Sequence, residues 1–500
     1  MGGTPASLGW TVVEVDLVPH APLWSLSATE LTAALRGGSV SAVSVMESVL
    51  ARVEAADPRL HAFVEVDVEG AMAAAAAADE AYREGTAGPL SGVPVSVKDL
   101  SRVIGMRTGF GRARRPTTPD TRDDLTVARL RAAGAILFGK TRTPERGYSY
   151  SSTSSDGVST RTPWRLDLGA GGSSSGAAAA VAAGMGPVAL GTDGAGSVRL
   201  PAALCGVVGL KPSFGRIPVY PLHDPYAASF VHIGPLTRTV ADAALFLDVT
   251  QGADPRDPLS WSDSATFTRT SATPSGLRLA WLEQPAEAMR VDTEVAGITW
   301  NSACRLSRAL GCTPPVRLPG LGDQSEVQRV LWECAQATSY SEPLADSVPE
   351  PLRRMVRRGY SRTMTELGAA GRARTALFHS VRTLFQNYDV VMTPTCPVAG
   401  WPHDRPVGLS PAEDDPMRAG VDVYPFNLTG NPAISLPAGW TAGGLPVGLQ
   451  LVTGWRADLL LLEVAFAFER VQPWADHWPV LDETRQKARR ARKVVGSRRS

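Results

Sequence analysis

The sequence predicts an α/β fold built around a substantially parallel β-sheet. Strand-like and helix-like segments alternate over the first 140 residues, and this alternation is typical of βαβ units. Hydrophobic residues make up 44% of the 500 residues, which excludes wholesale disorder. Large α/β enzymes of this length can share one continuous sheet, so the length alone does not require two domains.

Local patterns define the elements of the N-terminal part. Ser27 and Glu30 form a capping-box pattern before a short helix. Apolar residues at helical spacing predict a second helix over 41–56, which we expect Asp57 and Pro58 to end. The next predicted elements, in order, are a strand at 61–66, a helix at 71–81, a strand at 93–98, a helix at 125–133 and a strand at 135–138.

The rest of the chain changes character twice. Residues 140–220 are rich in Gly and Ser, so we expect loops and short helices there, where functional sites usually lie. From 274 to 384 the strand and helix patterns return, and the longest helix is predicted over 352–384. The remaining predicted elements are strands at 390–392, 433–436 and 447–452 and a helix at 459–469.

Composition excludes several classes of protein. A formal net charge of +1 argues against a surface that binds nucleic acid or an acidic membrane. The five cysteines are scattered and no histidines stand at ligand spacing, so we expect neither a disulfide framework nor a bound metal. The N-terminus lacks a signal peptide pattern, and the uncharged stretch 168–192 is Gly- and Ser-rich with Pro187 inside. We therefore expect a cytoplasmic protein without a membrane span.

Lysine is rare in this chain, which has five lysines against 45 arginines. Arg keeps its proton in proteins, whereas a buried Lys can lose it, so a retained Lys can mark chemistry that needs a neutral amine. Two of the five lie in the C-terminal tail. Lys98, Lys140 and Lys211 are therefore the candidates for catalysis.

Two short motifs match known patterns without their structural context. Residues 134–141 (GAILFGKT) fit the P-loop pattern, but their interior is an apolar strand and Pro144 stands where the helix should begin, so we reject a nucleotide site. Residues 172–176 (GSSSG) fit the nucleophile elbow, although no strand precedes them. That alternative would make Ser174 the nucleophile, assisted by one of the late histidines His379, His403 and His477.

A third match is much longer and more specific. Residues 171–212 read GGSSSGAAAAVAAGMGPVALGTDGAGSVRLPAALCGVVGLKP, which resembles the signature block of the amidase signature family of serine hydrolases. Further similar segments lie at 92–99, 133–141, 162–164, 426–432 and 444–450, in the family's order. The resemblance implies one large domain over 27–482, with a mixed, mostly parallel sheet flanked by helices on both faces. An N-terminal extension at 1–26 and a basic, disordered tail at 483–500 would lie outside it.

The resemblance also implies a catalytic triad. Ser197 corresponds to the family nucleophile, which would form an acyl-ester intermediate, and Ser173 to a bridging serine that follows a cis peptide bond at Gly172–Ser173. Lys98 corresponds to the general base. Because a serine hydroxyl is a weak nucleophile without an adjacent base, Lys98 must be buried enough to be neutral near pH 8.

Neighbouring residues would support this triad. The backbone N–H groups of Gly194, Ala195, Gly196 and Ser197 are the expected oxyanion donors, and no cofactor or metal is implied. We expect Asp193 and Arg199 to fix the oxyanion turn through charge-assisted hydrogen bonds. Ser174 is expected as a supporting residue, and Ser174 or Ser175 is expected to cap the following helix. Tyr148 and Ser149 are candidates for substrate contacts.

The sequence departs from the family pattern at Ala195, where the family usually has Gly. Alanine still supplies an N–H group but resists a positive φ, so the geometry of the turn is in question. After 139–141 the family commonly has Asn, and here Arg142 stands instead.

The leading interpretation is an amidase that hydrolyses the C–N bond of a linear small-molecule carboxamide to a carboxylic acid and ammonia or an amine. The alternative within the family is the A subunit of a tRNA-dependent amidotransferase, which releases ammonia from glutamine for a partner. A non-catalytic binding protein on the same scaffold is a third hypothesis. A homodimer is the default oligomer.

Overall fold

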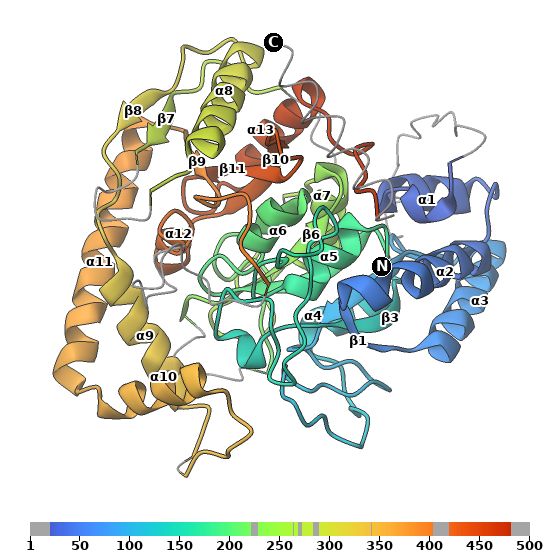
Figure 1. Ribbon diagram of the computed structural model, residues 1–500. Helices are drawn as coiled ribbons and strands as arrows, with labels where there is room; N and C mark the ends of the chain where they lie inside the picture. Colours follow the sequence, from blue (N-terminus) through green and yellow to red (C-terminus); the bar gives the residue numbers. More distant parts are fainter. Residues whose placement is uncertain are drawn as a thin grey trace, which may run out of the picture.

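A single mixed β-sheet runs through the protein, which we describe from a computed structural model (Figure 1). The structure describes residues 21–221, 229–263, 265–268, 273–283, 290–341, 343–403 and 420–481. Within these residues the sheet has eleven strands. In spatial order they are β1 (Phe63–Val66), β3 (Ile136–Thr141), β2 (Pro94–Lys98), β4 (Val188–Asp193), β6 (His232–Thr237), β5 (Val208–Lys211), β10 (Ala433–Trp440), β11 (Pro446–Thr453), β9 (Val390–Pro394), β7 (Leu279–Leu282) and β8 (Val316–Leu318).

The α/β class and the mixed sheet are confirmed, but the prediction of a mostly parallel sheet is wrong for the described strands. Parallel pairs occur at β2–β3, β2–β4, β7–β8 and β7–β9. The other six pairs are antiparallel. The β-then-α alternation that predicted parallel pairing holds near the N-terminus and returns at β7, β8 and β9, where helices separate the strands. In the C-terminal half β10 and β11 form a hairpin through a short turn, and a short connection forces antiparallel pairing.

Helices cover both faces of the sheet, as the family resemblance implies. One apolar cluster joins one face to α4, α7, α8 and α13, and a second joins the other face to α2, α3, α5 and α6. The helices are α1 (Ala28–Arg36), α2 (Ala42–Leu60), α3 (Val68–Glu84), α4 (Leu125–Ala132), α5 (Ser175–Ala182), α6 (Arg199–Cys205), α7 (Val240–Thr250), α8 (Thr293–Ala309), α9 (Ser325–Ala337), α10 (Glu350–Ser361), α11 (Met364–Asn387), α12 (Pro425–Leu428) and α13 (Asp458–Val471), with short 3₁₀ turns at η1 (Leu23–Ser25) and η2 (Glu145–Gly147).

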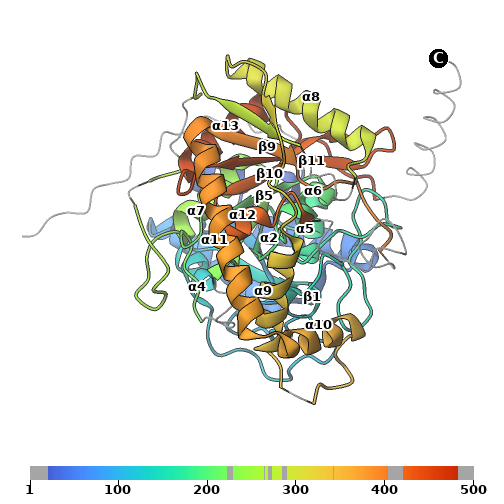
Figure 2. The ribbon, with the colours of Figure 1, turned by 90° about the vertical axis from the view of Figure 1, so that its left-hand side faces the viewer.

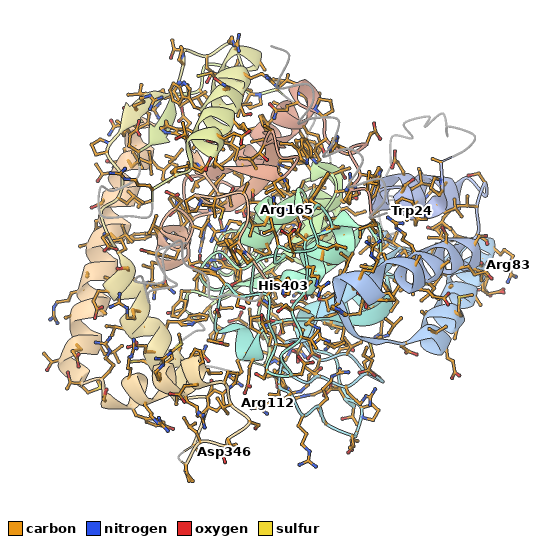
Figure 3. All side chains as sticks on the ribbon, viewed as in Figure 1. Trp24, Arg83, Arg112, Arg165, Asp346 and His403 are labelled. Carbon is orange, nitrogen blue, oxygen red and sulfur yellow. The ribbon has the colours of Figure 1, made fainter. Side chains whose placement is uncertain are left out.

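Three helices form an arm beside this core. α9 packs against α10 and α11, and all three lie at the left edge of Figure 1. Figure 2, which faces that edge, shows α11 and α9 in front of the sheet. Figure 3 shows side chains between the arm and the loops of the core. The arm supplies part of the wall of the candidate site described below.

Most predicted elements appear near their expected bounds, with two corrections. Pro58 does not end α2, which continues to Leu60 before His61 takes a left-handed conformation with φ 53°. The long helix predicted over 352–384 is two helices, because Thr363 caps a new helix with its side chain and with Glu366. The capping box at Ser27 and Glu30 is confirmed. The predicted tail at 483–500 and residues 1–20 of the expected N-terminal extension lie outside the described residues.

Strand direction gathers the candidate residues at one edge of the sheet. β2 and β4 are adjacent and parallel, so their carboxyl ends meet at the same edge. β2 ends at Lys98 and β4 ends at Asp193. Val95 and Val97 pack into one apolar cluster, so the alternation along the strand places Lys98 on the opposite face.

Candidate active site

Lys98 is buried completely at the end of β2, and its amine contacts three hydroxyl groups. Nζ lies 2.8 Å from Oγ of Ser173, 2.9 Å from Oγ of Ser174 and 2.9 Å from Oγ1 of Thr192. Burial lowers the pKa of Lys98 to about 7, although the negative charge of Asp193 acts in the opposite direction. Near neutral pH a large fraction of Lys98 is therefore an uncharged amine.

The hydrogen bonds around Lys98 determine which hydroxyl it can deprotonate. Ser174 donates its proton to the backbone carbonyl of Thr192 at 3.2 Å, so its oxygen accepts from Lys98. A neutral amine has two N–H donors and one lone pair. With Ser174 and Thr192 as acceptors, the lone pair is left for the proton of Ser173. This arrangement suits a base that acts on Ser173.

The predicted cis peptide bond between Gly172 and Ser173 is present. Glycine is required at position 172 because a Cβ atom there would lie 2.3 Å from the carbonyl oxygen of Ser151. Ser174 is the N-cap residue of α5, but its side chain makes no capping hydrogen bond and instead contacts Lys98 and the carbonyl of Thr192. Its supporting contact is therefore to the amine and not to the helix.

Ser197 lies in the tight turn between β4 and α6, beside the same cavity as Ser173. Its backbone carbonyl accepts a hydrogen bond from the N–H of Ser174 at 3.1 Å, which ties the two serine-bearing segments together. In the described part of the chain no hydrogen bond joins the hydroxyls of Ser173 and Ser197. Such contacts often tighten only when substrate binds.

Asp193 and Arg199 hold this turn, as predicted. The Asp193 carboxylate accepts from the N–H groups of Gly196 at 2.7 Å and Val198 at 3.1 Å, and from Nε and Nη2 of Arg199 at 3.0 Å each. Burial alone would raise the pKa of Asp193, but Arg199 holds it well below its usual range. The wholly buried ion pair therefore stays charged and rigid.

These contacts correct the predicted oxyanion hole. The N–H group of Gly196 already donates to Asp193, so it is not available to an oxyanion. Gly194, Ala195 and Ser197 remain as the candidate donors. The positive φ of the turn falls on Gly196, at 110°, and not on Ala195, so alanine causes no backbone strain there. The carbonyl of Ala195 accepts a hydrogen bond from the hydroxyl of Tyr150 at 2.6 Å.

Three residues with clear roles in this network escaped the sequence reasoning. Thr192 contacts Lys98 directly. Asn427 accepts from Arg199 at 2.6 Å and donates to Asp193 at 2.9 Å, and Gln450 accepts from Arg199 at 2.7 Å. Asn427 and Gln450 fall in the C-terminal segments that resemble the family, but the resemblance by itself does not show what they contact.

A cavity of about 150 Å³ opens beside Ser173 and Ser197. Its wall is largely apolar and aromatic. It is lined by Leu100, Ser101, Phe110, Asp124, Leu125, Thr126, Arg146, Gly147, Ser173, Thr192, Gly194, Ser197, Val219, Tyr220, Pro221, Val231, Ile233, Trp332 and Gln336.

Tyr148 and Ser149, the predicted substrate contacts, do not line this cavity. The chain turns sharply before them, since Arg146 and Gly147 both have positive φ. Tyr148 then packs against an apolar cluster of α10 and the preceding loop, and burial raises its pKa to about 12. Ser149 accepts a hydrogen bond from the backbone of Ser151. The aromatic residues that line the cavity are instead Phe110, Tyr220 and Trp332.

The alternative nucleophile elbow finds no support in the geometry. Ser174 is fully buried and does not line the cavity. His379 lies on α11, and the ring of His477 packs against the rings of Trp164 and Trp440. His403 lies among loops in Figure 3, and its backbone carbonyl accepts a hydrogen bond from Ser159. None of these three histidines lines the cavity.

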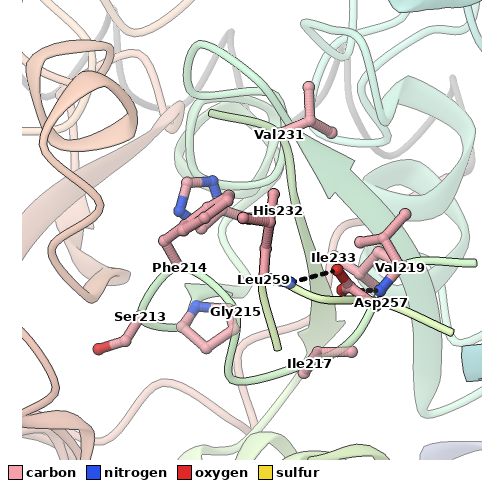
Figure 4. A pocket seen from close by; sticks show the side chains of 11 residues that line it. Ser213, Phe214, Gly215, Ile217, Val219, Val231, His232, Ile233, Asp257 and Leu259 are labelled. Carbon is pink, nitrogen blue, oxygen red and sulfur yellow. Dashed lines mark hydrogen bonds between the residues drawn. The ribbon is translucent and has the colours of Figure 1, made fainter. Parts of the chain in front are cut away.

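A smaller pocket lies behind β6, beside His232 (Figure 4). It has room for about 10 Å³, which suits one water molecule at most. Nδ1 of His232 lies 3.0 Å from the carbonyl of Phe230, and burial, together with the charge of Lys211, keeps the pKa of His232 well below its usual value. This histidine is therefore neutral, and the pocket beside it is too small for a substrate.

The P-loop alternative is excluded by the secondary structure. Residues Ile136–Thr141 form β3, so the glycine and lysine of the motif lie within a strand.

Among the described residues, no three side chains of metal-ligating type converge on one point. No described helix has the length and apolar character to cross a bilayer.

Comparisons with known proteins agree with this geometry. A sequence model of the Amidase family matches residues 44–462. An acylamidase from Rhodococcus erythropolis is 38% identical over 465 residues, which cover 91% of this chain and 97% of that protein. The A subunit of the glutamyl-tRNA(Gln) amidotransferase from Roseiflexus sp. (strain RS-1) is 33% identical over 501 residues, with 92% and 99% covered.

Solved structures give the same result. The crystal structure of a bacterial aryl acylamidase of the amidase signature family aligns with a TM-score of 0.83 at 30% identity, covering 91% of this chain and 98% of that one. The chain therefore belongs to the amidase signature family, whose fold and amide-hydrolysing class the sequence resemblance predicted.

Proposed function

We propose that this protein is a stand-alone amidase in which Ser197 is the nucleophile, Ser173 the bridging serine and Lys98 the general base. The observation that carries the proposal is the wholly buried Lys98 amine, with a pKa lowered to about 7, placed 2.8 Å from the Ser173 hydroxyl. Ser173 and Ser197 border one cavity. A neutral amine there can accept the proton that a serine must lose to attack a carbonyl.

The proposed reaction proceeds through an acyl-enzyme. Lys98 takes the Ser173 proton while Ser173 takes the Ser197 proton, and Oγ of Ser197 bonds to the carbonyl carbon. The N–H groups of Gly194, Ala195 and Ser197 stabilise the oxyanion. The relay then returns the proton to the leaving nitrogen as the C–N bond breaks. Water attacks the acyl-ester by the same relay and releases the carboxylic acid.

A largely apolar cavity supports an acylated aryl or alkyl amine as substrate, in line with the two acylamidases to which the chain is similar.

All five cysteines are free, which supports a location in a reducing compartment such as the cytoplasm.

The second candidate function is the A subunit of a tRNA-dependent amidotransferase. It is supported by the similarity to such proteins at 33% identity over nearly their whole length. The cavity argues for the first candidate, because glutamine is small and polar while the wall is mostly apolar. Hydrolysis of acetanilide and of glutamine by the isolated chain distinguishes the two.

The nucleophile is tested by intact-mass labelling with a fluorophosphonate. We expect one adduct on the wild type and none on Ser197→Ala. The matched control is Ser174→Ala, which should still be labelled because Ser174 does not reach the cavity. Labelling that persists in Ser197→Ala but is lost in Ser174→Ala would overturn the assignment in favour of the elbow mechanism.

A further inference from the structure

One polar side chain in the apolar wall of the cavity has an unsatisfied hydrogen-bonding atom. Gln336, on α9, is 5% exposed and lines the cavity that contains Ser197. Its Oε1 is buried and makes no hydrogen bond in the described structure. Burying a polar atom without a partner is unfavourable, so such an atom in a binding cavity is a reason to look for a partner on the ligand.

The position of Gln336 relative to the nucleophile follows from its helix. Trp332, one turn earlier on α9, lies against the oxyanion turn, because a Cβ atom added to Gly194 would come within 2.8 Å of its ring. Nε1 of Trp332 donates to the carbonyl of Tyr148 at 3.1 Å, which fixes the ring. Gln336 follows on the same face of the helix, about 6 Å further along the axis.

We propose that Gln336 determines specificity by hydrogen-bonding a second polar group on the substrate. The inference rests on the proposed function and names its substrate class: carboxamides with an apolar or aromatic skeleton and a second amide or hydroxyl group about one helical turn from the scissile carbonyl. A side-chain amide presents both donors and an acceptor, so a second carboxamide is its best partner. Trp332 would hold the intervening ring against the oxyanion turn.

The same helix supplies a matched control. Gln328, two turns earlier on α9, is completely buried, and neither its Oε1 nor its Nε2 has a hydrogen-bond partner in the described structure. It does not line the cavity. Replacing either glutamine with leucine removes a buried amide of similar size, but only Gln336→Leu changes the cavity wall.

The test uses two pairs of substrates that differ in one group. The first pair is acetanilide with a para-carbamoyl or a para-isopropenyl group on the leaving aniline, and these two groups have similar shapes. The second pair places the same two groups on the ring of a benzanilide acyl group. For each pair, the ratio of kcat/KM is measured in the wild type, Gln336→Leu and Gln328→Leu. Comparing ratios between variants cancels the intrinsic reactivity of each substrate.

We expect the wild type to prefer the carbamoyl compound of one pair, and Gln336→Leu to reduce that preference by about tenfold or more. Gln328→Leu should keep the wild-type ratio. A ratio unchanged by Gln336→Leu in both pairs, or reduced equally by Gln328→Leu, overturns the inference while leaving the amidase function intact. Thermal unfolding of both variants excludes misfolding as the cause of a change.

Binding provides a readout that does not need turnover. Each compound is used to protect the wild type and Gln336→Leu against fluorophosphonate labelling. Weaker protection by the carbamoyl compound in Gln336→Leu supports the proposal, and equal protection contradicts it. If the wild type neither hydrolyses any of the compounds nor is labelled, the proposed function itself fails, and the inference fails with it.

Discussion

Two buried lysines on neighbouring strands show what separates a candidate catalytic amine from a structural one. Lys98 ends β2, and Lys140 lies on β3 opposite Val97, which places it on the other face of the sheet from Lys98. Both are completely buried. Burial lowers the pKa of Lys98 to about 7 and that of Lys140 to about 8.

The partners of these two amines differ. Lys98 contacts three hydroxyl groups, and two of these, on Ser173 and Thr192, belong to residues that line the cavity. Lys140 donates to the carbonyl of Ser101 and to Thr108 at 2.7 Å, and lies 3.9 Å from the Asp99 carboxylate. Both lysines are buried, but only the Lys98 amine contacts hydroxyls of residues that line the cavity, which supports the proposal that Lys98 passes a proton towards a substrate.

The largest predicted effect separates activity from stability. Lys98→Met should lower kcat by roughly 10³-fold, because it removes the base, without lowering the free energy of unfolding. Lys140→Met should instead lower the free energy of unfolding by about 3 kcal/mol, because it leaves the carboxylate of Asp99 with less compensation. Anilide kinetics and urea unfolding of both variants measure this. Equal losses of activity without loss of stability would contradict the distinction.

A smaller effect on the reaction rate is predicted for substitutions in the candidate oxyanion turn, residues 194–197. Gly196→Ala should slow acylation by about 10²-fold, because the new Cβ would lie 2.3 Å from Cγ2 of Val423 and alanine resists the φ of 110°. Ala195→Gly should change the rate by less than about threefold, because Ala195 is not in that conformation. Fluorophosphonate labelling rates test the pair, and the reverse order of effects would show that the turn has a different geometry.

The pH dependence of stability should show a smaller effect of the same amine. An unfolded lysine keeps its proton to a pH of about 10.4, whereas folded Lys98 loses it near 7. The unfolded state therefore binds more protons between these values, so this group makes the free energy of unfolding rise with pH across that window. Between pH 7 and pH 9, the free energy of unfolding measured with urea should rise less in Lys98→Met than in the wild type. Parallel curves would mean that folded Lys98 is charged.

The sequence located the residues that meet around Lys98 better than it located the cavity wall. Lys98, Ser173 and the Asp193–Arg199 pair lie in short segments that resemble those of the family, so the resemblance identified them together. The hydrogen bond from the Gly196 N–H group to Asp193 depends on the geometry of the turn, which residue types alone do not reveal. Trp332 and Gln336 line the cavity from a helix that lies more than 130 residues after Ser197 in the sequence. No local sequence pattern therefore indicated that they belong to the site.

The fold shows the same division. Capping boxes and apolar periodicity predicted individual helices such as α1, but not the break between α10 and α11, where Thr363 starts a new helix inside a continuous helical pattern. Strand direction was predicted from the N-terminal alternation alone. It failed where β10 and β11 pair as a hairpin, because pairing depends on the connection and not on the strand.

The central claim is that a neutral Lys98 activates Ser197 through Ser173. Its most direct test is the pH dependence of the second-order rate of fluorophosphonate labelling, in the wild type and in Lys98→Met. We predict that the wild-type rate rises with pH through a single pKa near 7, as Lys98 loses its proton, and then levels off. Lys98→Met should label far more slowly, without that titration. A wild-type profile with the same pKa in Lys98→Met would contradict the claim.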